Sequence, residues 1–196
     1  EAVLKDIDFS CHKGQKIAVI GSTGSGKSTL VKLMNRFYDV SRGSIEINGV
    51  DIRKYDLESL RAQIGYVAQK AHMFKGSIQS NICFGKPEAS VEEMFHAATV
   101  AQASDFISTR EHGFEDEIAE DGTNISGGQK QRLSIARVIL KKPSLYIYDD
   151  SFSALDFKTD ATLRKALKPE VKKAIFFEVA QRNSTIMDSD MIIDLD

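Results

Sequence analysis

A glycine-rich run near the N-terminus has the residue types and spacing of a phosphate-binding loop. Its members match the pattern G-x-x-x-x-G-K-[ST] in full and are Gly21, Ser22, Thr23, Gly24, Ser25, Gly26, Lys27 and Ser28. Glycines let backbone N–H groups turn inward around a phosphate, and the positive end of the following helix adds to the attraction. The run therefore predicts a nucleotide site, although kinases, GTPases and recombination ATPases share the pattern. The alternative, a glycine-rich turn that only joins a strand to a helix, is disfavoured by the complete match.

Three side chains of this region are expected to contact the nucleotide and its metal ion. Lys27 would reach the β- and γ-phosphates, Ser28 would ligate Mg²⁺, and Thr29 would contact the α-phosphate.

An apolar strand that ends in an acidic residue would supply the second half of such a site. Residues 145–149 fit this description, and Asp149 is expected to hold the magnesium ion through water. A carboxylate at the end of a strand is common by chance. The prediction therefore depends on the presence of the phosphate-binding loop in the same chain.

A second pair of glycines follows Ser126 at the beginning of a predicted helix. Ser126 is expected to cap this helix, and Gly127 and Gly128 would expose backbone N–H groups at its positive end. The segment thus predicts a second anion site, separate in sequence from the first. An ordinary helix beginning is the alternative for these three residues taken alone.

The elements that must position these residues follow from periodicity, capping residues and turns. Strands are expected at 3–9, 16–20, 44–47, 50–52, 64–67, 145–148, 174–179 and 191–195. Asn48-Gly49 indicates a hairpin. Helices are expected at 28–36, from Asp56 to about 63, at 90–101 from a capping box, and at 127–140.

Alternating strands and helices at both ends, with a mostly helical middle, indicate an α/β chain. We expect a P-loop NTPase core with a mostly parallel sheet, an antiparallel β subdomain and a helical subdomain insertion. The predicted division places 1–69 and 141–196 in the nucleotide-binding core with its β subdomain, and 70–140 in the helical subdomain.

Composition excludes several other classes of protein. The 196 residues, 42% hydrophobic and 28% charged, suffice for one well-cored domain and argue against disorder. The net charge of −2 argues against a non-specific nucleic-acid binder. Cys11 and Cys83 show no pairing or metal-ligand pattern, and no apolar run approaches the ~18 residues that span a bilayer. The fragment is therefore expected to be soluble, in a reducing compartment.

The motifs together resemble the nucleotide-binding domain of ATP-binding cassette (ABC) transporters. They occur in the order that this family shows: the phosphate-binding loop, Gln69 of the Q-loop, the signature segment, Asp149, and the D-loop at 153–156. The signature segment comprises Ser126, Gly127, Gly128 and Gln129. The resemblance implies that the chain binds and hydrolyses ATP with Mg²⁺. It also implies a head-to-tail dimer, in which each ATP lies between one chain's phosphate-binding loop and the other's signature segment.

Further implications concern the membrane. In this family Gln69 would ligate Mg²⁺ and sense the membrane domain. Residues 74–84 and 117–122 look like the exporter branch, in which the latter segment contacts the coupling helices of the transmembrane domain. The resemblance therefore implies a place on the cytoplasmic face of the cell membrane, with no nucleic-acid partner.

Two positions depart from the family pattern. Asp150 stands where a catalytic glutamate is usual, with about 1.5 Å less reach, and a misplacement of that order can lower a rate about 10²-fold. Gln181 stands where the family has a switch histidine, and an amide cannot become cationic. The two changes resemble the degenerate subunit of a heterodimeric exporter, whose partner carries the Glu and His. A fully active domain that tolerates both changes is the alternative.

Two other functions stay open at this point. A soluble ABC ATPase acting on DNA or ribosomes would usually carry coiled-coil or basic insertions, which this sequence lacks. A nucleotide-binding regulatory module without turnover is compatible with the changes at Asp150 and Gln181.

Overall fold

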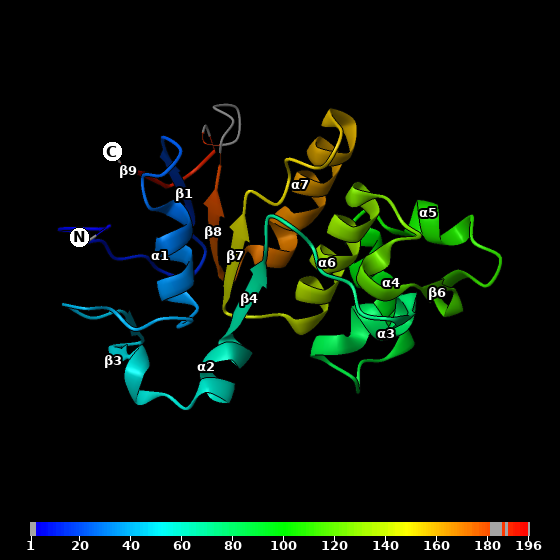
Figure 1. Ribbon diagram of the computed structural model, residues 1–196, viewed down its shortest axis with the longest axis horizontal. Coiled ribbons are helices and arrows are strands. Elements are labelled where there is room, and N and C mark those ends of the chain that lie inside the picture. The colour runs from blue at the N-terminus through cyan, green and yellow to red at the C-terminus, as the bar shows by residue number, and fades with distance from the viewer. Residues whose placement is uncertain (1–2, 181–185, 187, 196) are drawn as a thin grey trace. The chain divides into compact units, whose positions relative to one another are not determined.

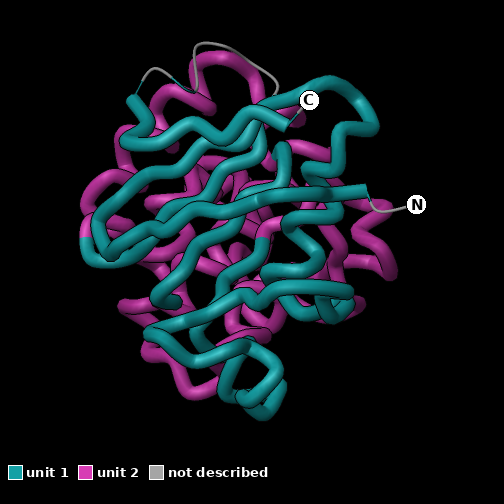
Figure 2. The backbone as a smooth tube through the Cα atoms, turned by 90° about the vertical axis from the view of Figure 1, so that its left-hand side faces the viewer, with its two compact units in different colours: residues 1–66, 143–150, 173–196 teal, residues 67–142, 151–172 magenta. Residues whose placement is uncertain are grey.

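The computed structural model describes residues 3–180, 186 and 188–195. Its chain forms two compact units, each assembled from separated stretches of sequence (Figure 2). Unit 1 comprises 1–66, 143–150 and 173–196, and unit 2 comprises 67–142 and 151–172. Residues 151–172 thus cluster with the helical unit, whereas the sequence places them in the nucleotide-binding core.

Unit 1 is built on a parallel sheet. Among the described residues this sheet has five strands in the order β4-β7-β8-β1-β9 (Figure 1). They are β1 (Lys16–Gly21), β4 (Ile64–Val67), β7 (Leu145–Asp149), β8 (Ile175–Val179) and β9 (Met191–Leu195). β8 pairs in parallel with both β1 and β7. The carboxyl ends of β1 and β7 therefore reach the same edge of the sheet, which is where α/β proteins bind ligands.

Short elements complete unit 1. Helix α1 (Lys27–Met34) buries Leu30, Val31 and Met34. α2 (Leu57–Gln63) begins at the predicted cap Asp56, whose side chain accepts a hydrogen bond from the Ser59 amide. β2 (Glu46–Ile47) and β3 (Val50–Asp51) pair antiparallel across the predicted turn and precede a 3-10 turn, Ile52–Lys54.

A buried charge lies within the apolar strand β8. Glu178 is only 2% exposed, and its carboxylate lies 3.7 Å from the ammonium of Lys16. Because Ala18 is opposite Glu178 and Lys16 is opposite Phe176, the two charged residues lie two positions apart on one face of the sheet. The ion pair explains how this strand accommodates a carboxylate.

The strand predicted at 3–9 does not form, and that prediction was wrong. The segment packs without a ladder: Leu4 and Phe9 lie against the core, and the ring of Phe9 stacks on Phe177 at 6.3 Å. Asp6 has φ of 53°, which interrupts an extended backbone. The apolar side chains of this segment alternate because they pack on the core, and alternation alone therefore does not indicate a strand here.

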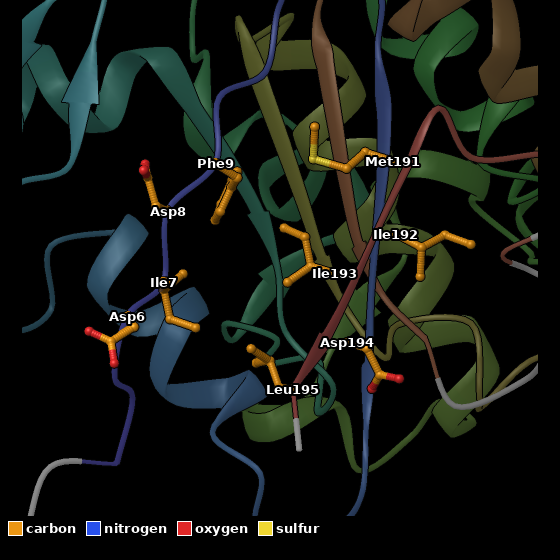
Figure 3. Close-up of a pocket in the computed structure, with 9 residues that line it drawn as sticks. All are labelled: Asp6, Ile7, Asp8, Phe9, Met191, Ile192, Ile193, Asp194 and Leu195. Carbon is orange, nitrogen blue, oxygen red and sulfur yellow. The ribbon is translucent and has the colours of Figure 1, made fainter.

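A groove lies between residues 6–9 and strand β9 (Figure 3). Ile193 and Leu195 point toward the segment, whereas Ile192 and Asp194 point away from it (Figure 3). The groove is lined by these two stretches alone, and none of the predicted nucleotide residues lines it.

Unit 2 is helical around one long central helix, α6 (Gly127–Lys141). Four further helices belong to its described part: α3 (Ile78–Ile82), α4 (Val91–Val100), α5 (Ser104–Ser108) and α7 (Phe157–Val171). The strands β5 (Gly76–Ser77) and β6 (Glu117–Ile118) form a small antiparallel ladder. Three 3-10 turns lie at Cys83–Gly85, Gly113–Glu115 and Glu120–Gly122.

The ends of the unit 2 helices agree with their predicted signals. Ser90 and Glu93 form the predicted capping box of α4. α6 ends at Lys142, which has φ of 51°, immediately before Pro143. The parallel sheet, the small antiparallel ladders and the helices confirm the predicted α/β P-loop class. Within the described ranges, no helix is both long and apolar enough to cross a membrane.

Candidate nucleotide site

The glycine-rich run lies at the carboxyl end of β1 and leads directly into α1. Gly21 has φ of 144°, and a Cβ there would lie 2.2 Å from the carbonyl oxygen of Leu195. Gly26 has φ of 103° and forms the N-terminal boundary of α1 without a side-chain cap. Glycine is required at the first position by the neighbouring backbone and favoured at the second by its left-handed conformation. The first turn of α1 is left for an anion to cap.

Lys27 places its charge inside this loop. Its ammonium donates hydrogen bonds to the carbonyl oxygens of Gly21 at 2.7 Å and Ser22 at 2.6 Å. Ser22, Gly24 and Ser28 are exposed beside it. The loop therefore presents a cation and accessible backbone on one surface, as a phosphate cradle requires.

The acidic end of β7 faces a hydroxyl that the sequence analysis missed. Tyr66 Oη donates a hydrogen bond of 3.3 Å to Oδ2 of Asp149. Burial raises the pKa of Asp149, and the hydrogen bond from Tyr66 opposes that rise. Burial likewise raises the pKa of Tyr66 to about 12, so its phenol stays a donor. Only the adjacency of β4 and β7 could have indicated this pair, and the sequence does not give strand order.

Asp150 follows in an uncommon backbone conformation. Its φ is 48°, and its amide donates a hydrogen bond of 3.1 Å to the carbonyl oxygen of Val179. Aspartate adopts this left-handed region more readily than glutamate does, because its short side chain bonds locally. The predicted partner Gln181 lies outside the described residues. The role of Asp150 stays a prediction.

In unit 2, Gln69 is exposed on a bend that follows β4. Two buried polar side chains hold the backbone before it. Gln131 of α6 donates a hydrogen bond of 3.1 Å to Ala68 O, and Ser151 Oγ donates one of 2.8 Å to Val67 O. Gln131 and Ser151 were not predicted, and both tie the bend to neighbouring motif segments.

The signature segment begins α6 with a complete capping box. Ser126 Oγ accepts a hydrogen bond of 3.2 Å from the Gln129 amide, and Gln129 Oε1 accepts one of 2.9 Å from the Ser126 amide. Neither bond uses the amides of Gly127 and Gly128. Gly127 is exposed, and a Cβ there would meet no atom within 4 Å. The beginning of α6 therefore offers two amides and the helix dipole to an anion.

The predicted residues thus fall into two groups. The phosphate-binding loop, Asp149 and Asp150 belong to unit 1, whereas Gln69 and the signature segment belong to unit 2. The N-terminus of α1 in unit 1 and the N-terminus of α6 in unit 2 could each bind an anion.

Comparison with known proteins decides between the classes that share a phosphate-binding loop. The family model described as "ABC transporter" matches residues 4–153. The chain belongs to the ABC transporter family. As an ATPase domain of that family, it has ATP binding and hydrolysis as its chemistry, which confirms the predicted enzyme class.

The relatives of this ABC domain include a putative multidrug export protein. The chain is 45% identical over 193 residues to "Putative multidrug export ATP-binding/permease protein YgaD" of Bacillus subtilis, covering 98% of this chain and 33% of that protein. It is 43% identical over 194 residues to "Heavy metal tolerance factor 1" of Caenorhabditis elegans, covering 99% of this chain and 24% of that protein. The chain thus spans a third or less of the length of these relatives.

A solved structure agrees with the sequence relatives. The fold matches a bacterial Atm1-family ABC exporter with ATP bound, with a TM-score of 0.90 and 39% identity. The match covers 93% of this chain and 32% of that one. The exporter-type resemblance inferred from the motifs is therefore confirmed.

Proposed function

We propose that this chain is the nucleotide-binding domain of an exporter, and that it closes head-to-tail on a second such domain when MgATP binds. The observation that carries the proposal is the second anion site at the beginning of α6. The phosphate-binding loop already supplies one cation, Lys27, and one uncapped helix end for the chain's own nucleotide. The exposed Gly127 and the partly exposed Gly128, whose amides the capping box does not use, are then available to a nucleotide held by a partner.

The residues of unit 1 suit a magnesium ion. Mg²⁺ prefers oxygen ligands and usually takes only one or two carboxylates from the protein, with phosphate oxygens and water completing its shell. Ser28 is exposed and Asp149 is half-buried at the carboxyl edge of the sheet, and both belong to unit 1. When bound, the ion neutralises charge on the β- and γ-phosphates.

The chain's own site is proposed to hydrolyse ATP slowly. The support is chemical: Asp150 is shorter than the usual glutamate, and Gln181 cannot carry a positive charge. We therefore propose a heterodimer, in which the partner's Glu and His carry out most of the turnover.

A membrane partner is proposed from the relatives and from an aromatic surface on unit 2. The rings of Phe74 and Phe84 stack at 4.3 Å, and the guanidinium of Arg137 lies 5.4 and 5.7 Å from their centroids. Both rings are about half exposed, at 46% and 58%. We propose that coupling helices of a transmembrane domain cover these rings, with this domain on the cytoplasmic face of the membrane.

A nucleotide-binding module without turnover is the second candidate, and Asp150 is the observation that favours it. Measuring phosphate release distinguishes the hydrolysing exporter domain from the module without turnover. The chain alone should turn over slowly, and mixing it with a Glu- and His-bearing partner domain should raise turnover well above the sum of the separate rates. Rates that simply add would support the regulatory module.

A further inference from the structure

Asn124 joins the signature helix to the neighbouring 117–119 segment. Its Oδ1 accepts a hydrogen bond of 2.9 Å from the Ala119 amide, and its Nδ2 donates one of 2.8 Å to the carbonyl oxygen of Glu117. Both distances are those of well-formed hydrogen bonds. Only a carboxamide accepts and donates at adjacent atoms in this way, so an aspartate would keep one bond and an alanine neither.

The joined segment is held at its other side as well. Glu117 and Ile118 pair with Ser77 and Gly76 in the β5–β6 ladder. After Ile118 the chain turns sharply, with φ of 54° at Asp121. The ammonium of Lys130, one turn into α6, donates a hydrogen bond of 2.7 Å to the carbonyl oxygen of Asp121. The segment from 117 to 121 is therefore bound to the first turn of α6 through Asn124 and Lys130.

Asn124 is connected to the beginning of α6 through a short, well-packed stretch of backbone. Ile125, the next residue, is buried, and its amide donates a hydrogen bond of 3.1 Å to the carbonyl oxygen of Gly122. Ser126 follows directly and closes the capping box that leaves the Gly127 amide exposed. Asn124 is thus only two positions before Ser126. A displacement of the 117–119 backbone would move Asn124 and, with it, the Gly127 amide that would contact a phosphate.

We propose that Asn124 is a positioning residue, which fixes the orientation of the signature amides by holding the beginning of α6 to the 117–119 backbone. This inference rests on the proposed role of the signature segment toward the partner's nucleotide. Asn124 is a separate residue from that segment and acts through it. Loss of the carboxamide leaves the capping box intact but lets α6 begin in more than one orientation.

The test uses the full transporter that contains this chain, with phosphate release as the readout. Asn124→Ala lowers kcat about tenfold and leaves the KM for ATP unchanged, since a misplacement of 1 Å can cost up to about 10²-fold in rate. Asn124→Asp, which keeps the bond from the Ala119 amide, falls between Asn124→Ala and the wild type. Gln63→Ala is the matched control: it also removes a carboxamide that donates to a backbone carbonyl, that of Ser59 in α2.

Hydrogen exchange supplies a readout that does not depend on turnover. The Ala119 amide exchanges faster in Asn124→Ala and keeps its wild-type rate in Gln63→Ala. Equal kcat values for Asn124→Ala and Gln63→Ala, in protein that binds MgATP normally, would overturn the proposal.

A bulky Ser126 variant separates this inference from the proposed function. If Ser126→Tyr also leaves kcat unchanged, the role of the signature segment fails, and the role of Asn124 fails with it. If Ser126→Tyr abolishes turnover while Asn124→Ala has no effect, only the positioning role is wrong.

Discussion

Tyr66 and Asp149 are neighbours across two strands of the parallel sheet, and the phenol of the first donates a 3.3 Å hydrogen bond to the carboxylate of the second. The ring of Tyr66 is itself held by the edge of Phe37, at 5.9 Å between centroids. The bond engages Oδ2 of Asp149, the residue that would hold a magnesium ion through water. A residue outside the family motifs thus orients one inside them.

Tyr66→Phe should weaken the magnesium-dependent part of ATP binding by a few-fold. Without the phenol, Asp149 loses one of the interactions that oppose the burial-driven rise of its pKa. The carboxylate would then be less ordered and more readily protonated. Calorimetry with ATP, with and without Mg²⁺, measures the effect. Tyr55→Phe is the control, because Tyr55 Oη donates a hydrogen bond of 3.0 Å to Ile47 O in the same unit. Equal losses in both variants would contradict the assignment.

Asp149→Asn should stabilise the nucleotide-free protein at neutral pH. Burial raises the folded-state pKa of Asp149, so folding disfavours the charged form. This destabilisation of the folded state by charged Asp149 is absent below the unfolded-state pKa. It is fully present once the pH exceeds the folded-state pKa. The unfolding temperature of the wild type should therefore fall, relative to the variant, as the pH rises through that window. Parallel pH profiles for the two proteins would disprove the linkage.

Lys27→Ala should weaken MgATP binding by at least about 1 kcal/mol, since hydrogen bonds to charged groups contribute ~1.5–3 kcal/mol. The ammonium is the cation held within the loop by Gly21 and Ser22. Lys54→Ala removes the same charge from an exposed position in unit 1 and serves as the control. If calorimetry gives the two variants equal affinity, Lys27 does not bind the phosphates.

Restoring the usual catalytic pair should raise turnover. Asp150→Glu combined with Gln181→His is expected to exceed either change alone, because both groups act on one γ-phosphate. The left-handed backbone at residue 150 limits the gain, since glutamate fits it less well than aspartate. Phosphate release by the isolated chain measures the effect. A wild-type rate equal to that of the double variant would show that the site was never degenerate.

Local patterns predicted the parts of the fold that depend on neighbouring residues. The capping box at Ser90, the caps at Asp56 and Ser126 and the Asn48-Gly49 hairpin all form where the sequence indicates them. Each depends on side chains within four positions, so sequence spacing is enough to specify them.

Contacts between distant segments could not be predicted in the same way. Tyr66 meets Asp149 only because β4 is next to β7, and Gln131 bonds to Ala68 across 63 positions of the sequence. Periodicity also predicted a strand at 3–9, where packing of Phe9 on Phe177 occurs without strand pairing. Strand order and tertiary packing decide these features, and neither is encoded in local spacing.

In the proposed heterodimer this chain contributes its signature segment to the partner's ATP, while its own site turns over slowly. Ser126 and the adjacent amides would stabilise charge on the γ-phosphate as it is transferred. The most direct measurement compares phosphate release from two reconstituted heterodimers, one with Ser126 replaced by tyrosine and one with Asp150→Asn. We expect the Ser126 change to abolish most turnover and the Asp150 change to reduce turnover much less. Greater damage from the Asp150 change would contradict this expectation.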